Sequence, residues 1–204
     1  NDPQKAEYAI AVAAVLGYLS VHNMDKVSFK LMKGDKSDDK RGVIVGKRAF
    51  FDAVTELEAI DFDGDSDIES AVISCQDLGG NDGLAVIISD FFTESNWKKA
   101  VDFLSFKKKQ VLLIQVMTPD EIDPAYTGRV HLIDSEAPTL EDEKNMKIKI
   151  DRSNLTAYQQ ALKAQQDELR TFCHSRGADF ITVCTDKPIE KVLFKELLKV
   201  GIIE

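Results

Sequence analysis

Three short, predominantly apolar runs constrain the fold more than any other feature of the sequence. They are LAVIIS at 84–89, VLLIQVM at 111–117 and FITVC at 180–184. Apolar runs of this length are typical of strands that are buried on both faces of a parallel sheet. Segments with helical periodicity separate them, such as the one at 97–106. Strands that alternate with helices predict an α/β fold, with helices covering both faces of the sheet.

Weaker signals outline the first part of the chain. Asp2 followed by Pro3 predicts the start of a helix that ends near Val21. Alternating apolar residues then predict two short strands, at 27–32 and 42–46, joined by a polar turn.

Two helices are predicted before the first buried strand. In the earlier one, Phe51, Val54 and Leu57 recur at helical spacing, so we expect these side chains to face the core. The later helix is expected to run from Ile68 to about Leu78, where two glycines follow.

The last part of the chain contains an insertion and two more helices. Within the irregular segment 118–150, alternation at 129–134 and 146–150 predicts a β-hairpin insertion. A long helix follows, and Pro188 begins a last one. The apolar stripe of the long helix comprises Leu155, Tyr158, Leu162, Leu169 and Phe172. We see no repeat and no low-complexity linker, so the sequence predicts a single domain over residues 1–204.

Composition excludes several classes of function. The formal net charge of -9 argues against nucleic acid or an anionic membrane as the main partner. Three cysteines without a C-x-x-C pair indicate reduced thiols and a cytoplasmic, reducing compartment. The most apolar stretch, 8–21, is shorter than the roughly 20 residues that span a bilayer, so we expect a buried helix there.

The segment DFDGDSD, at 61–67, places four aspartates within seven residues. A calcium-binding EF-hand loop that starts at Asp61 would need Gly at its sixth position and Glu at its twelfth, where this chain has Ser66 and Val72. The segment is also similar to the D-x-D-G-T motif of haloacid-dehalogenase-type phosphatases, in which the first Asp is the nucleophile. That chemistry needs a buried strand before Asp61, and the preceding residues have helical periodicity instead.

A third interpretation places these aspartates before a helix. Ser66 and Glu69 have the spacing of a capping box, in which the Ser caps the helix that follows. Ligands of α/β proteins bind where such helix ends meet the carboxyl edge of a parallel sheet. Asp90 ends the strand 84–89 at that edge. It is a candidate for the same site, and capping of the turn that follows is the alternative.

The order of these segments resembles the von Willebrand factor A-like domain of bacterial proteins in domain-of-unknown-function family fifty-eight. The most specific matches are the strand end SDF and the pattern E-x-D…G-x-V-x-L-x-D-x-E. Together the similar segments span nearly the whole chain. They are KAEYAIAVAAVLGYLSVHNMDKVSF, GDSDIESAV, VIISDFF, VMTPDEIDPAYTGRVHLIDSE and YQQALKAQQDELRTFCHSRGADFITVCTDKPIEKVL.

The resemblance implies a Rossmann-like, doubly wound, mostly parallel sheet that carries a metal-ion-dependent adhesion site. In such domains an Asp-x-Ser-x-Ser loop, a Thr and an Asp hold Mg²⁺, and a carboxylate of the partner completes its coordination. The Thr position corresponds here to Ser66 and the Asp to Asp90, with Asp65 and Asp67 as further candidate ligands. The strand with the Asp-x-Ser-x-Ser loop is expected before Asp2 and is absent from this sequence. We therefore expect an N-terminally truncated domain that binds Mg²⁺ weakly or not at all.

The resemblance also implies a protein partner. Family members are often encoded beside MoxR-type AAA+ ATPases and anchored to the inner membrane by upstream helices. We therefore expect a non-enzymatic protein-interaction domain, an adaptor for such an ATPase and the soluble part of an anchored protein. Phe91 and Phe92 are the expected partner-binding residues, and the alternative is that one or both belong to the core. The alternative functions are a metal-dependent phosphohydrolase that uses the carboxylates of 61–67 and a scaffold without a metal.

Overall fold

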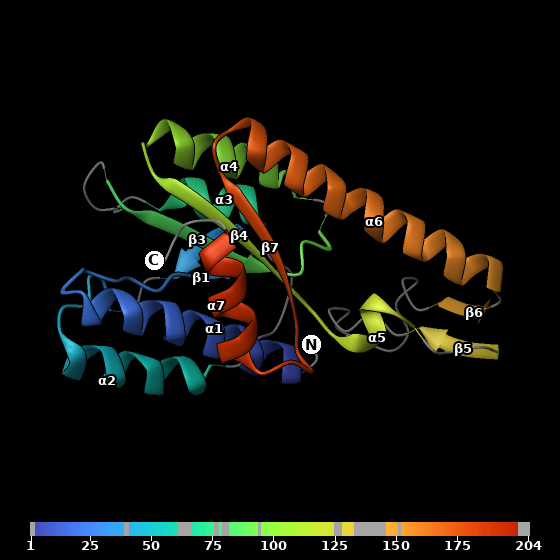
Figure 1. Cartoon of the computed structure of the whole chain (residues 1–204), viewed down its shortest axis with the longest axis horizontal. Coiled ribbons are helices and arrows are strands. Elements are labelled where there is room, and N and C mark those ends of the chain that lie inside the picture. The colour runs from blue at the N-terminus through green and yellow to red at the C-terminus, as the bar shows by residue number, and fades with distance from the viewer. Residues whose placement is uncertain are drawn as a thin grey trace.

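A three-stranded parallel sheet forms the centre of the computed structural model (Figure 1). It consists of β3 (Leu84–Ser89), β4 (Gln110–Met117) and β7 (Asp179–Cys184), in the order β3-β4-β7. Both pairings are parallel, as the apolar runs predicted. The structure describes residues 3–38, 41–60, 67–75, 78, 82–93, 95–124, 128–132, 146–150 and 152–199.

Helices cover both faces of this sheet (Figure 1). Among the described residues, helices pack on each face, which confirms the predicted α/β layering. On one face lie α1 (Pro3–His22) and α7 (Ile189–Lys199). On the other lie α3 (Ile68–Ser74), α4 (Trp97–Phe106) and α6 (Arg152–Ser175).

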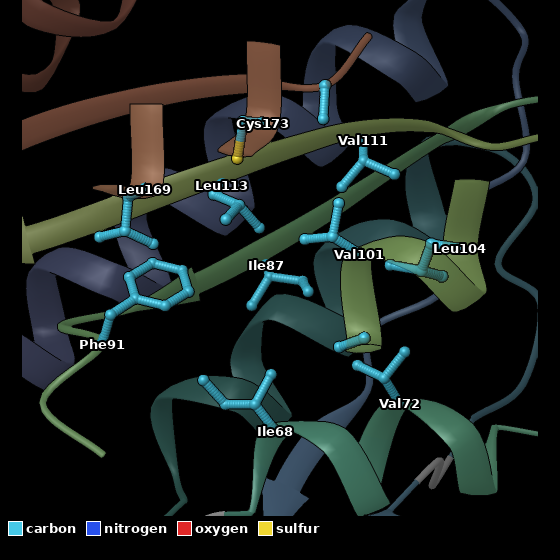
Figure 2. Packing of buried hydrophobic residues seen from close by; sticks show 12 residues of the cluster. Ile68, Val72, Ile87, Phe91, Val101, Leu104, Val111, Leu113, Leu169 and Cys173 are labelled. Carbon is cyan, nitrogen blue, oxygen red and sulfur yellow. The ribbon is translucent and has the colours of Figure 1, made fainter. Parts of the chain in front are cut away.

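The middle strand, β4, supplies side chains to the core on both faces. Leu112 and Ile114 pack with α1 and α7, whereas Val111 and Leu113 pack with the three opposite helices (Figure 2). Every residue of β4 after the first is buried because a strand lies on either side and helices lie above and below. Gln115 is the polar exception, and its side chain is fully buried.

A smaller cluster joins α1 to α2 (Lys47–Glu58) and includes Val21, Ile44, Phe50 and Ala53. The predicted core face of α2 is wrong by one residue at its start, because Phe50 is 2% exposed and Phe51 is 57% exposed. The ring of Phe50 packs against α1 at Gly17, which has no side chain to exclude it. Helical spacing alone does not distinguish two adjacent phenylalanines.

The predicted pair of strands at 27–32 and 42–46 is also wrong. Those segments share a single bridge, between Val27 and Ile44. Instead, β1 (Leu31–Lys33) pairs directly with β2 (Lys36–Asp38). Gly34 adopts a φ of 57°, a left-handed conformation that suits a two-residue hairpin turn, so the chain reverses earlier than the polar run suggested.

Between β4 and α6 the chain forms a short helix, α5 (Pro119–Ile122), and the predicted hairpin of β5 (Gly128–Leu132) with β6 (Met146–Ile150). The hairpin and the first part of α6 lie beyond one end of the sheet (Figure 1). The predicted stripe on α6 is confirmed at its centre, where Leu162 and Leu169 are buried. No helix in the described ranges is long and apolar enough to cross a membrane.

Candidate functional site at the carboxyl edge of the sheet

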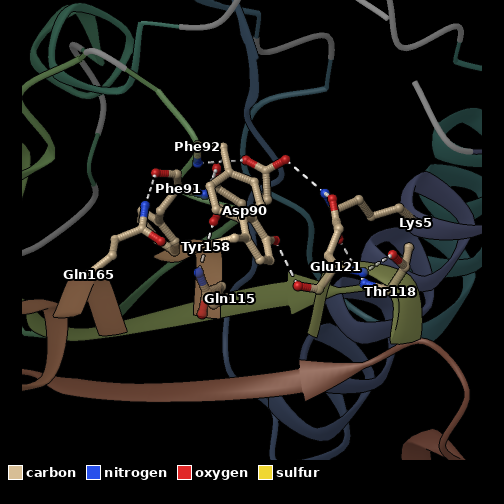
Figure 3. A network of polar contacts seen from close by, with 10 residues as sticks. Lys5, Asp90, Phe91, Phe92, Gln115, Thr118, Glu121, Tyr158 and Gln165 are labelled. Atoms are coloured by element: carbon tan, nitrogen blue, oxygen red, sulfur yellow. Dashed lines mark hydrogen bonds and ion pairs between the residues drawn. The ribbon is translucent and has the colours of Figure 1, made fainter. Parts of the chain in front are cut away.

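Polar side chains gather where β3 and β4 end. Asp90 follows the last residue of β3, and Thr118 follows the last residue of β4. Because the two strands are parallel neighbours, both residues lie at the same edge of the sheet (Figure 3). This carboxyl edge is where ligands of open α/β sheets bind.

The turn after β3 points two neighbouring rings in different directions. The amide N–H of Phe91 donates to Oγ of Ser89 at 3.0 Å, and the amide N–H of Phe92 donates to Oδ1 of Asp90 at 3.0 Å. Phe91 has a φ of 59°, an uncommon conformation for a bulky residue. Phe91 is 1% exposed and belongs to the core, whereas Phe92 is 44% exposed. The alternative assignment to the core is thus confirmed for Phe91, which leaves Phe92 as the ring at the surface.

Two glutamine amides hold the backbone of this turn. Nε2 of Gln115 donates to the carbonyl oxygen of Asp90 at 3.0 Å, and Nε2 of Gln165 donates to that of Phe91 at 2.8 Å (Figure 3). Oε1 of Gln115 accepts from Gln166 at 3.0 Å and from Thr182 at 3.3 Å. The buried amide of Gln115 is therefore satisfied on both sides. These bonds fix the turn that carries Asp90 and Phe92.

Lys5, in the first turns of α1, bridges two carboxylates at this edge. Its Nζ donates to Oδ2 of Asp90 at 2.9 Å and to Oε1 of Glu121 at 2.6 Å. The same nitrogen lies 5.6 Å from the centre of the Phe92 ring, within the range of a cation–π contact. Burial by itself would lower the pKa of Lys5, but the bonds and charges of Asp90 and Glu121 raise it above its ordinary value. Lys5 is therefore a charged ammonium at neutral pH.

Glu121 is held from three directions. The amide N–H of Thr118 donates to Oε2 of Glu121 at 2.8 Å, and the amide N–H of Glu121 donates to Oγ1 of Thr118 at 3.3 Å. This reciprocal pair is a capping box at the start of α5. The hydroxyl of Tyr158, from α6, donates to the carbonyl oxygen of Glu121 at 2.7 Å. The carboxylate that meets Lys5 is consequently rigid.

Asp67, at the start of α3, caps that helix. Its Oδ1 accepts from the amide N–H of Ser70 at 3.2 Å and from Oγ of Ser95 at 2.7 Å, and its Oδ2 accepts from Oγ of Ser70 at 2.6 Å. Hydrogen bonds lower the pKa of Asp67. The bond from Ser70 has the largest effect, followed by the bond from Ser95. The predicted N-cap, Ser66, is therefore wrong by one residue, since the helix begins after Asp67. The helix is also shorter than predicted and ends at Ser74, because Cys75 turns to an extended conformation.

The described residues do not fit the Mg²⁺ site that the resemblance implies. Both carboxylate oxygens of Asp90 accept hydrogen bonds from the protein, and so do both of Asp67. Within the described ranges, no three His, Cys, Asp or Glu residues are placed to hold a metal ion. Mg²⁺ needs near-octahedral oxygen ligands, and at Asp90 the ammonium of Lys5 already lies where a cation would bind. Ser66, Asp65 and the candidate nucleophile Asp61 lie outside the described residues.

Sequence reasoning located Asp90 and Phe92 at this edge and missed Lys5, Glu121 and the glutamines. A signal for Glu121 was available, because Thr118 and Glu121 have the T-x-x-E spacing of a capping box. No local sequence pattern predicts Lys5, because its partner Asp90 lies 85 residues away in the sequence. Its role became visible only once α1 had been placed against the sheet.

These features define a layered α/β domain with an ion-paired polar cluster and an exposed aromatic ring at the carboxyl edge of its sheet. The chain belongs to the family described as Protein of unknown function DUF58, which matches residues 1–168. This family is the one that the sequence motifs indicated.

A curated protein matches about half of this chain in sequence. An uncharacterized protein of Mycobacterium avium, MAV169, is 29% identical over 105 residues, a match that covers 52% of this chain and 59% of that protein. The chain thus matches little more than half the length of this curated relative.

Two solved structures have a similar fold. One is an aerotolerance-related membrane protein from Bacteroides fragilis, solved with multiple mutations to serines, with a TM-score of 0.51 and 14% identity over 95% of this chain and 89% of that one. The other is the conserved hypothetical protein BatB from Bacteroides thetaiotaomicron, with a TM-score of 0.52 and 13% identity over 97% and 89%. At this level of identity the likeness concerns the fold alone.

Proposed function

We propose that this chain is a non-enzymatic protein-interaction domain of von Willebrand factor A type. Its binding face is the carboxyl edge of the sheet around Asp90 and Phe92. The observation that carries the proposal is Phe92, which is 44% exposed although the side-chain amides of Gln115 and Gln165 hold the turn beneath it. A rigid, exposed aromatic ring beside charged groups is typical of an anchor in a protein interface.

The proposed partner is a MoxR-type AAA+ ATPase, for which the domain acts as an adaptor. The support is the family membership together with the resemblance that implies such neighbours. The net charge of -9 favours a protein over a nucleic acid as the partner. We further propose that the domain is the cytoplasmic part of an inner-membrane-anchored protein. The similar Bacteroides fragilis structure is that of an aerotolerance-related membrane protein, which supports this placement.

A binding assay with purified components tests both parts of the proposal. The chain is immobilised, and a purified MoxR-type ATPase from the same genome is passed over it with ATP. We expect binding that Phe92→Ala weakens about thirtyfold, because truncation of an interface anchor costs about 2 kcal/mol. Asp90→Ala should weaken binding as well, since its carboxylate holds the turn and Lys5.

Matched controls come from the opposite side of the domain. Phe106 is 80% exposed at the end of α4, next to the amino end of β4, so Phe106→Ala should leave binding unchanged. Asp25→Ala, at an exposed position after α1, is the control for loss of a carboxylate. Equal binding by wild type and Phe92→Ala would refute the proposed face. Absence of binding by the wild type would refute the proposed partner.

A further inference from the structure

The ammonium of Lys5 forms ion pairs with two carboxylates at once. Oδ2 of Asp90 lies 2.9 Å from Nζ, and Oε1 of Glu121 lies 2.6 Å from it (Figure 3). The three residues come from α1, from the turn after β3 and from α5, so the contact joins distant parts of the chain. The side chains are 18%, 35% and 28% exposed, which limits screening of their charges by water.

Without a cation between them, these two carboxylates would face the same point and repel each other. Two carboxylates that share one hydrogen-bond donor need a proton or a positive charge to offset their repulsion. Lys5 supplies one positive charge to two negative ones, so the trio keeps a net negative charge. The need for a cation at this edge is thus met from within the chain.

The remaining oxygens of the two carboxylates also have donors. Oδ1 of Asp90 accepts from the amide N–H of Phe92, and Oε2 of Glu121 accepts from the amide N–H of Thr118. A Mg²⁺ ion would have to displace the ammonium and exchange its own waters for oxygens that already accept hydrogen bonds. The donor set therefore favours the ammonium over a divalent metal.

We propose that Lys5 is the built-in cation of this edge, which holds Asp90 and Glu121 together and makes the 90–92 turn independent of divalent metal ions. The Nζ of Lys5 also lies 5.6 Å from the ring centre of Phe92, so the same cation supports the exposed ring. This inference depends on the ion pairs alone and stands whether or not the proposed partner binds.

Thermal unfolding in EDTA and in millimolar MgCl₂ or CaCl₂ tests it. Wild type should have the same Tm in all three buffers. Lys5→Met should lower Tm in EDTA by about 2–4 °C or more, the scale of shift expected for a chain of this length. A divalent cation should then raise the Tm of Lys5→Met, because the carboxylates are left uncompensated. The double variant Lys5→Met/Asp90→Asn has lost one of the two negative charges. Divalent cations should therefore no longer raise its Tm.

Two further variants serve as controls. Lys5→Arg keeps a positive charge, so it should remain insensitive to divalent ions. Lys163→Met removes an exposed lysine from α6 and should change neither Tm nor the cation response. A Tm of Lys5→Met equal to that of wild type, or a loss of Tm that neither Mg²⁺ nor Ca²⁺ reverses, would overturn the proposal.

Calorimetric titration of wild type with MgCl₂ alone decides the matter if Lys5→Met does not fold in any buffer. The proposal expects no saturable heat at millimolar Mg²⁺ in wild type. Saturable binding that Asp90→Asn abolishes would show that a metal, rather than Lys5, is the cation of this edge.

Discussion

The buried side-chain amide of Gln115 donates a 3.0 Å hydrogen bond to the backbone carbonyl of Asp90, which links the middle strand of the sheet to the turn after its neighbour. Gln115 is the one fully buried polar side chain among those described on β4, and its oxygen also accepts two bonds. Gln115, a polar residue inside an apolar strand, thus positions the turn residues that reach the surface.

Replacement of Gln115 by Leu should destabilise the protein by about 1–3 kcal/mol, because the carbonyl of Asp90 and the amide of Gln166 lose a buried partner. Unfolding in urea, followed by circular dichroism, measures this free energy. The control is Gln110→Leu, at the exposed first position of the same strand, which should change stability little. Equal losses for the two variants would contradict the role assigned to Gln115.

Gly17→Ala should destabilise the protein although Ala favours helices over Gly by about 1 kcal/mol. A Cβ at this position would lie 2.8 Å from Cε2 of Phe50 and 2.9 Å from Cζ of Phe29. Such overpacking costs about 1–3 kcal/mol. The double variant Gly17→Ala/Phe50→Leu should lose less than the sum of the two single variants, and strict additivity would show that the two positions do not interact.

Asp67→Asn should reduce stability at neutral pH, since a charged carboxylate caps α3 through three hydrogen bonds. The pKa of Asp67 is lowered below its ordinary value of 3.8 by bonds from Ser70 and Ser95. A lowered folded-state pKa contributes stability that is present above the unfolded pKa and is lost as pH falls through the folded one. The gap between wild type and Asp67→Asn in urea unfolding should therefore close at acid pH, and a gap that widens there would refute this.

The purified chain should not hydrolyse phosphomonoesters. The candidate nucleophile, Asp61, lacks the apolar strand that would pre-organise it, and α2 precedes it instead. Assays with a generic chromogenic phosphomonoester, with and without Mg²⁺, measure this. Turnover that disappears in Asp61→Asn would establish the phosphohydrolase and reject the proposal of a non-enzymatic domain.

The sheet could be predicted from the sequence because its strands are buried on both faces. Continuous apolar runs such as 84–89 have few other uses in a chain of this composition. The small cluster around α2 was harder, because Phe50 and Phe51 are adjacent and only tertiary packing, such as the contact with Gly17, selects one of them. A pattern local to the helix does not contain that information.

The site was predictable only in part, for a related reason. Asp90 follows a recognisable strand, so its place at the edge could be expected. Lys5 lies 116 residues from Glu121 in sequence, and the pair forms through the packing of α1 against the sheet. Long-range ion pairs of this kind have no periodicity, whereas the capping box of Thr118 and Glu121 was a local signal that could have been used.

A single helix sets the spacing between the two loops at the sheet edge. Tyr158 of α6 holds the segment after β4 through Glu121 of α5, and Gln165 holds the turn after β3 through Phe91. At about 1.5 Å per residue, the seven steps between them span about 10 Å of rigid rod. One residue inserted between these positions would rotate one contact by about 100° around the helix axis. The length and phase of α6 are consequently as much a part of the proposed binding face as the residues on its surface.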